Sequence, residues 1–460
     1  PWWDILKNLS MDACMKTRNQ GNFLGLTPML LFVSLVVITG LLANDFGAMP
    51  ILVAFMISAG YALTLNPREH KISVGQKVDI FCAGGGEKTI ILLVIIFLMA
   101  GAFYSLTIDI GARDATVNWA LLFVPTIILL PGLFIISCFI SFAMGTSMGT
   151  ITAIVPIGIG LAESIGIPIP LAIGIVIGGA MFGDNLSFIS DTTIAATRTQ
   201  GVRLKDKFKA NLIIVTPAAL LTFVALMFVD FDMQANIAPD NYEFQLILPY
   251  IFIIVSALMG LNVIAVLGIG IGCAGVVGIW TEAFDMIGLF ASIQTGMGWM
   301  QDLAAIAVVI GGIIALMKAY GGMDWLMTTI TRGVKTTKGA EYSIATLVSF
   351  LDLATANNTI AIVSAGPIAK DLNQQFQIDP RRTASLLDIF SCGFQGLVPY
   401  GGQLLTAAAL AGISPLAISP YCWYPMLIIL FGVLAIATGL PKFKTQALDE
   451  HESHALGQTP

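Results

Sequence analysis

Long apolar blocks alternate with short polar stretches along the whole chain. An α-helix rises 1.5 Å per residue, so a block of about 20 residues crosses the roughly 30 Å core of a bilayer. Several blocks are shorter and come in pairs, as expected for broken helices that are buried in protein or line a wet cavity. The pattern predicts an all-α polytopic membrane protein. The blocks cover residues 24–43, 46–65, 89–108, 117–143, 150–163, 168–182, 193–200, 210–229, 245–261, 262–280, 301–320, 341–353, 359–369, 383–398, 402–413 and 421–440.

Composition supports this prediction. The 460 residues are 57% hydrophobic and 11% charged, whereas soluble domains are about 25% charged. The six cysteines are far apart and the three histidines lie in polar stretches, so neither a disulfide framework nor a zinc site is indicated, and His451 and His454 are poor metal candidates. No nucleotide-binding loop or nucleophile elbow stands out. We therefore expect no enzyme, no cofactor and no nucleic-acid partner.

The distribution of Lys and Arg predicts the orientation. These residues gather in the stretches 66–79, 201–209, 321–340 and 370–382 and after the last apolar block, and they are absent from 230–244, 281–300 and 413–421. The positive-inside rule places the basic stretches in the cytoplasm. We expect a bacterial inner (plasma) membrane protein with both termini cytoplasmic, namely residues 1–23 and the tail 441–460. Arg113 is the one basic residue on the wrong side, and Asp45 is expected in a short outer turn.

The order of blocks repeats. Three spans, a split pair, a broken helix and a closing span run through residues 24–229, and the same order recurs through 245–440 after an outer loop at 230–244. The best match pairs SFAMGTSMGTITAIV (141–155) with SFLDLATANNTIAIV (349–363), a shift of 208 residues. The first copy starts from the cytoplasm and the second from outside. We therefore predict two inverted-topology repeats, each with a re-entrant or broken hairpin, which is typical of secondary transporters.

The segment 178–202 has the strongest chemical signal. Two carboxylates and several neutral oxygen donors lie within ten residues at membrane depth, and hard cations prefer oxygen ligands. An ionised Asp costs at least about 2.5–3.5 kcal/mol at the centre of a membrane helix, so an idle one is not expected. Either carboxylate instead only caps the following helix, as Asp often does. The candidate ion-binding residues here are Asp184, Asn185, Ser187, Ser190, Asp191 and Thr192, with Asp184 and Asp191 as transient Na⁺ ligands.

Polar side chains elsewhere extend this site. The interrupted stretches 145–150 and 353–358 are predicted to be hairpin tips that meet near the midplane, or else places where small residues pack helices together. We expect Asp388 to face the site or to pair with Arg381 or Arg382. The basic run 198–209 is expected to be a solvated flank, which leaves no obvious basic residue inside the site. The further candidates are Thr146, Ser147, Asp352, Asn357, Asn358, Asp388 and Gln403.

The motif GDNLSFISDTT at 183–193 resembles the signature of the NhaC-type sodium/proton antiporter family, part of the wider ion-transporter superfamily. That signature usually reads G-D-x-x-S-P-x-S-D-T-T, and Phe188 replaces its Pro here. The resemblance implies that Asp184 and Asp191 are ion-site residues. It also implies a second range of cargo, because the family includes members that exchange organic acids or amino acids.

Our hypothesis is a secondary active transporter that exchanges Na⁺ for H⁺ by alternating access at a buried Asp site. Its partners are membrane lipid, Na⁺ and H⁺, and a homodimer is left open. The alternative is a Na⁺- or H⁺-coupled transporter or exchanger of a small organic acid or amino acid. An intramembrane aspartyl protease is disfavoured because the chain has no Tyr-Asp pair.

Overall fold

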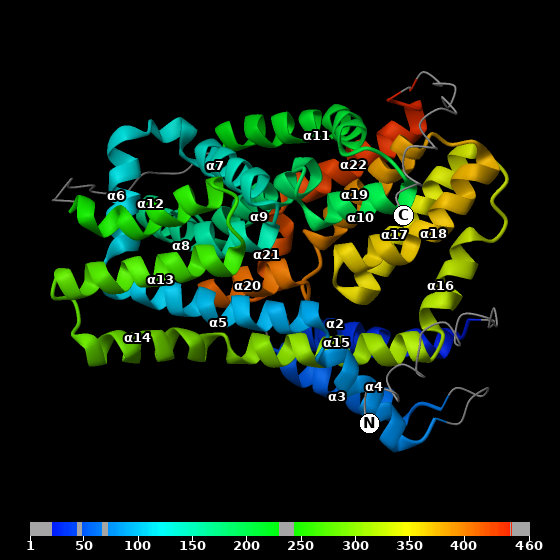
Figure 1. Ribbon diagram of the computed structural model, residues 1–460, viewed down its shortest axis with the longest axis horizontal. Helices are drawn as coiled ribbons and strands as arrows, with labels where there is room; N and C mark the ends of the chain where they lie inside the picture. The colour runs from blue at the N-terminus through cyan, green and yellow to red at the C-terminus, as the bar shows by residue number, and fades with distance from the viewer. Residues whose placement is uncertain (1–20, 44–47, 67–71, 230–242, 442, 444–460) are drawn as a thin grey trace, which may run out of the picture.

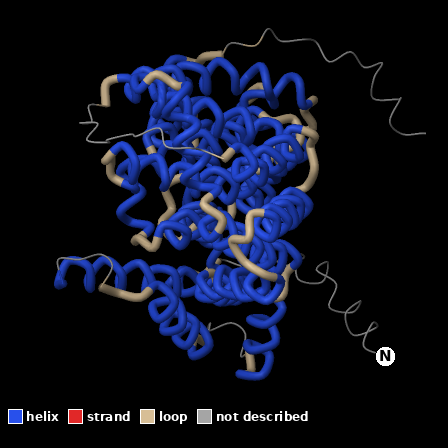
Figure 2. Tube along the Cα trace, turned by 90° about the vertical axis from the view of Figure 1, so that its left-hand side faces the viewer, coloured by secondary structure: helices blue, strands red, loops and turns tan. Residues whose placement is uncertain are grey.

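The structure, a computed structural model, describes residues 21–43, 48–66, 72–229, 243–441 and 443. Every regular element in these ranges is a helix, as predicted, and Figure 2 shows only helices and the loops between them. Asp45, His451, His454 and most of both terminal segments lie outside the described residues.

The helices of the first half follow one another from the N-terminal side (Figure 1). They are η1 (Phe23–Leu26), α2 (Thr27–Ala43), α3 (Ile51–Thr64), α4 (Val74–Gly85), α5 (Lys88–Asp109), α6 (Ala112–Phe123), η2 (Thr126–Ile128), α7 (Leu129–Met144), α8 (Ser147–Ile165), α9 (Ile169–Leu186), α10 (Asp191–Gln200) and α11 (Leu204–Met227). The second half contains α12 (Phe244–Leu258), α13 (Val263–Trp280), α14 (Met286–Trp299), α15 (Gln301–Ala319), α16 (Gly322–Thr331), α17 (Thr337–Thr355), α18 (Asn358–Phe376), α19 (Pro380–Gln395), α20 (Gly402–Ala411), α21 (Pro415–Ile418), η3 (Ser419–Tyr421) and α22 (Trp423–Thr438).

The number of membrane-spanning helices confirms a multi-pass protein. Seven described helices are long and apolar enough to span a bilayer, or eight if the bent pair Gly402–Ala411 and Pro415–Tyr421 counts as one. Three predicted connections were wrong, because α4, α14 and α16 occupy parts of the stretches that we expected to be loops at 66–79, 281–300 and 321–340. Each of these helices is only 10 to 14 residues long, which explains why a search for spans of about 20 residues missed them.

The two halves have matching helix boundaries. Helices α8, α9 and α10 begin at Ser147, Ile169 and Asp191, and α18, α19 and α20 begin 211 residues later at Asn358, Pro380 and Gly402. The shift of 208 residues expected from the sequence match is therefore wrong by three. Helical caps agree with the new register, because Gly111 and Gly321 both precede a helix with a positive φ, at 72° and 76°. The order of elements thus recurs, while the opposite membrane direction of the two halves remains a prediction.

Contacts between the halves are exchanged in pairs. Helix α5 packs on α14 where α4 packs on α15, α8 packs on α20 where α10 packs on α18, and α9 packs on α22 where α11 packs on α19. The first two crossings are so close that a Cβ on Gly101 would lie 2.1 Å from the Gly296 carbonyl oxygen, and one on Gly84 would lie 2.4 Å from that of Gly311. A two-fold relation between the halves produces this exchange, and it brings both hairpin tips and both helix breaks to the middle of the molecule (Figure 1).

Candidate functional site

Both predicted tips are sharp turns between antiparallel neighbours. Helix α7 ends at Gly145 with φ 66°, and Thr146 is extended at φ −150° before α8 begins. Helix α17 ends at Ala356 with φ 47°, and Asn357 is extended at φ −151° before α18 begins. A Cβ on Gly145 would also lie 3.0 Å from the Ile189 carbonyl carbon, so glycine is needed both for its φ and for the close approach. The first tip therefore packs directly against the break between α9 and α10.

Asp184 joins that break to the tip. It lies in the last turn of α9 with 2% of its surface exposed, and its Oδ1 accepts a hydrogen bond of 3.0 Å from the Ser147 backbone N–H. Its backbone carbonyl accepts hydrogen bonds from the hydroxyls of Thr192 and Thr193 at 3.2 and 3.4 Å. The carboxylate therefore faces the N-terminus of α8, where free N–H groups and the helix dipole favour negative charge. It does not cap the helix that follows it, and among the described residues no basic side chain pairs with it.

Asp191 is placed differently. It is the first residue of α10 and is exposed. Its Oδ1 accepts a hydrogen bond of 3.0 Å from the Thr192 N–H, so the capping alternative holds in part here. Its Oδ2 accepts a hydrogen bond of 2.6 Å from the Thr359 hydroxyl of α18. Asp191 therefore links the first break to the second tip, and its negative charge acts on Asp184 through space.

Neutral oxygens surround this pair of acids. Ser190 and Thr192 share a hydrogen bond of 2.9 Å between their hydroxyls. The Asn185 side-chain nitrogen donates to the Met181 carbonyl at 2.7 Å, while its Oδ1 is buried and has no partner. The Ser187 hydroxyl accepts a hydrogen bond of 3.3 Å from a backbone N–H within the break. The break thus supplies the oxygen-rich surroundings that its sequence predicts.

Two glutamines connect the second break to the first tip. Gln403 donates to the Ser147 hydroxyl at 3.1 Å, and Gln395 donates to Gln403 at 2.6 Å. Gln395 also donates to the Ala356 carbonyl of the second tip at 3.2 Å. In the 211-residue register Gln395 is the counterpart of Asp184, so each break contacts its own tip, through an acid in the first half and an amide in the second. The sequence reasoning missed Gln395 because its register was wrong.

The remaining tip candidates lie apart from this network. Asn357 caps α18 by accepting from the Ile360 N–H at 2.9 Å, and Asn358 reaches the Cys392 sulfur at 3.9 Å. Thr146 precedes α8 without a side-chain hydrogen bond to it. Asp352 is fully buried, and neither of its carboxylate oxygens has a partner. In the corrected register it replaces Ser141, not Met144.

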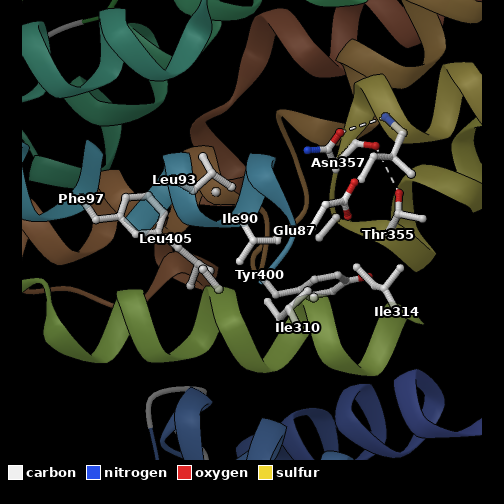
Figure 3. A pocket seen from close by; sticks show the side chains of 15 residues that line it. Glu87, Ile90, Leu93, Phe97, Ile310, Ile314, Thr355, Asn357, Tyr400 and Leu405 are labelled. Carbon is white, nitrogen blue, oxygen red and sulfur yellow. Dashed lines mark hydrogen bonds between the residues drawn. The ribbon is translucent and has the colours of Figure 1, made fainter. Parts of the chain in front are cut away.

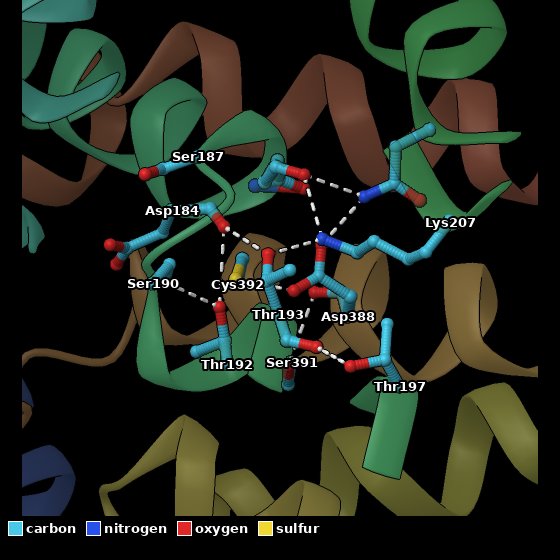
Figure 4. Close-up of polar contacts among 12 residues, drawn as sticks. Asp184, Ser187, Ser190, Thr192, Thr193, Thr197, Lys207, Asp388, Ser391 and Cys392 are labelled. Atoms are coloured by element: carbon cyan, nitrogen blue, oxygen red, sulfur yellow. Dashed lines mark hydrogen bonds and ion pairs between the residues drawn. The ribbon is translucent and has the colours of Figure 1, made fainter. Parts of the chain in front are cut away.

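A buried basic residue, which the sequence reasoning placed on a solvated flank, lies beside the first break (Figure 4). Lys207 is 1% exposed and forms an ion pair with the fully buried Asp388, with 2.8 Å between Nζ and Oδ2. Asn211, one turn further along α11, donates to the same Oδ2 at 2.7 Å. The usable signal was the four-residue spacing of Lys207 and Asn211, which places both on one face of α11.

Asp388 therefore pairs with neither arginine considered for it. Arg381 pairs with Asp379 at 2.6 Å, and Arg382 pairs with Glu341 in the same region of the fold. Arg113, which seemed misplaced, forms an ion pair with Asp114 at 2.9 Å and another with Glu163 at 3.1 Å.

A narrow cavity lies on the other side of the second tip (Figure 3). It has a volume of about 40 Å³ and lies between α5, α15 and the second hairpin and break. Its wall is mainly apolar, with polar groups from Glu87, Thr355, Asn357 and Tyr400. One water needs about 10–15 Å³ by this measure, so the cavity holds about three waters.

Comparisons with known proteins point to one family. A family model described as "Na+/H+ antiporter family" matches residues 71–231 and 242–440. The chain is 24% identical to the malate-2H⁺/Na⁺-lactate antiporter of Bacillus subtilis and 25% identical to the Na⁺/H⁺ antiporter NhaC of Alkalihalophilus pseudofirmus, each match covering 85% of this chain and 90% of the relative. It is 23% identical to the arginine/ornithine antiporter ArcD of Halobacterium salinarum over 80% of this chain and 81% of that protein. Among solved structures, the YdaH transporter of Alcanivorax borkumensis aligns with a TM-score of 0.42 and 13% identity over 90% of this chain and 99% of that one.

Proposed function

This chain belongs to the Na⁺/H⁺ antiporter family, and on that premise we propose that it exchanges Na⁺ for H⁺ across the membrane with Asp184 as the shared binding group. The observation that carries the proposal is the contrast between two buried acids. Asp388 is neutralised by Lys207, whereas Asp184 has no basic partner among the described residues. A buried carboxylate without a fixed countercharge needs a mobile one.

Either ion satisfies that need, but not both at once. A proton on the carboxyl removes its charge, and a Na⁺ ion beside the carboxylate balances it. The Ser147 N–H and the start of α8 help to hold the ionised form when Na⁺ is bound. Oxygens of Asn185, Ser190 and Thr192 are placed to complete the shell around the ion. Competition for one carboxylate then gives exchange.

The break and tips also suit alternating access. The site joins the first break to tips from both halves, through Asp184 with Ser147 and Asp191 with Thr359. Relative movement of the two inverted halves would expose it to one side of the membrane at a time. The distribution of Lys and Arg supports an inner-membrane orientation with both termini in the cytoplasm.

A second candidate function is the coupled exchange of an amino acid or a small organic acid. It is favoured by the names of two relatives, a malate/lactate and an arginine/ornithine antiporter. Geometry favours it less. The cavity of about 40 Å³ is smaller than such a solute, and Lys207 is already occupied by Asp388 and does not await a carboxylate.

The test uses purified protein in liposomes with an internal pH dye and an acid interior. External NaCl, KCl and choline chloride are added in turn, followed by arginine, ornithine, malate and lactate. Proton efflux with NaCl in the wild type, lost in Asp184→Asn, is the expected result. Efflux driven only by an organic solute would transfer the assignment to the second candidate. Full activity in Asp184→Asn would remove Asp184 from the site.

A further inference from the structure

The ammonium group of Lys207 lies in a closed set of oxygen atoms. Nζ donates to the Asn185 carbonyl at 2.8 Å, to the Thr193 hydroxyl at 2.6 Å and to Asp388 Oδ2 at 2.8 Å (Figure 4). A Lys ammonium has three N–H donors, and all three are used. The oxygens come from three helices, α9, α10 and α19, and the fourth helix, α11, carries Lys207 itself.

The types of ligand match those of a metal cation site. One carboxylate, one backbone carbonyl and one hydroxyl form the donor set that hard cations take in proteins. Two of the three oxygens are held in place independently of the lysine. Asn211 donates to the Asn185 carbonyl at 2.8 Å and to Asp388 Oδ2 at 2.7 Å. The set of oxygens is therefore held by the packing of α11 on α9 and α19, not only by the ammonium.

We infer that this oxygen cage, formed by Asn185, Thr193 and Asp388, is a second cation site that Lys207 permanently occupies as a tethered cation. The lysine excludes Na⁺ from the cage and leaves Asp184 as the group that exchanges ions. The two sites are adjacent, because Thr193 also donates to the Asp184 carbonyl and the cage carbonyl belongs to the next residue. Lys207 thus sets the number of small cations that the chain binds.

The consequence is that removal of the ammonium creates a Na⁺ site. Lys207→Ala empties the cage while the carboxylate of Asp388 stays buried. Lys207→Met removes the charge but fills the space with a methyl group. Lys205→Ala is the matched control, since Lys205 lies in the same turn of α11 and is exposed.

The experiment counts bound ions by equilibrium binding of radioactive ²²Na⁺ to purified protein. Lys207→Ala is expected to bind one Na⁺ per chain more than the wild type, and the double variant Lys207→Ala/Asp388→Asn to lose that added ion. Lys207→Met and Lys205→Ala are expected to bind as the wild type does. No added ion in Lys207→Ala, or an added ion that survives Asp388→Asn, would overturn the inference.

An unstable Lys207→Ala protein still gives an answer. The inference requires that NaCl or ammonium chloride raises its thermal stability far more than choline chloride does, because a small cation replaces the missing ammonium. Equal stability in the three salts, or failure to recover folded protein in any of them, would count against it. The outcome is separable from that of the proposed function: the added ion depends on Asp388, whereas ion binding by the wild type depends on Asp184.

Discussion

The buried pair of Lys207 and Asp388 gives the most quantitative prediction. Asp388→Asn keeps the shape of the side chain but leaves an ammonium at 1% exposure without a countercharge. Removing one partner of a buried ion pair typically costs about 3–5 kcal/mol. The amide oxygen can still accept one hydrogen bond, so we expect a loss of about 3 kcal/mol in the free energy of unfolding, at the lower end of that range.

The double variant Lys207→Met/Asp388→Asn separates the pair from the two side chains. It removes both charges at nearly constant volume, so we expect it to lose less than Asp388→Asn alone, with a coupling energy of up to about 3 kcal/mol. The assay is equilibrium unfolding in mixed micelles titrated with SDS, followed by tryptophan fluorescence. Asp206→Asn is the control, because its partner Arg203 is 75% exposed and surface pairs contribute about 0.2–1 kcal/mol.

Two results would refute this reasoning. One is a loss in Asp388→Asn no larger than that in Asp206→Asn. The other is a double variant whose loss equals the sum of the two single variants, which would mean that the charges do not interact.

Two further predictions concern packing and the unpartnered acid. Gly101→Ala should cost about 1–3 kcal/mol, because its Cβ would lie 2.1 Å from the Gly296 carbonyl oxygen; Gly272→Ala, with nothing within 4 Å of the new atom, should be neutral or stabilising by up to about 1 kcal/mol, and equal losses in the same SDS titration would contradict the close crossing. Asp352→Asn should leave stability within about 1 kcal/mol of the wild type, because it removes a buried carboxylate that has no hydrogen-bond partner to lose. It should also leave the number of bound Na⁺ ions unchanged, and a lost ion in the ²²Na⁺ assay would place Asp352 in the ion site.

The sequence was sufficient for the helical class, for the positions of both tips and for the acids of the first break. These features depend on local composition: apolar length gives the spans, and Gly145 and Asn357 interrupt them. It was not sufficient for the short helices α4 and α14, which are apolar but shorter than a bilayer is thick.

The partners of charged groups were the main failure. Lys207 lies in a run of five basic residues, and its burial depends on how α11 packs on α9 and α19, which local sequence does not reveal. The register error had a similar origin. Five identities in apolar sequence favoured a shift of 208, whereas the helix caps at Gly145 and Ala356 give 211.

The most direct test of the central claim measures Na⁺ binding to the wild-type protein by calorimetry at several pH values. If Na⁺ and H⁺ compete for Asp184, the apparent affinity for Na⁺ falls by about tenfold for each unit of pH on the acidic side, and one proton is released for each ion bound there. Asp184→Asn should bind no Na⁺ at this site at any pH. Na⁺ binding with an affinity independent of pH, or binding retained in Asp184→Asn, would contradict the account.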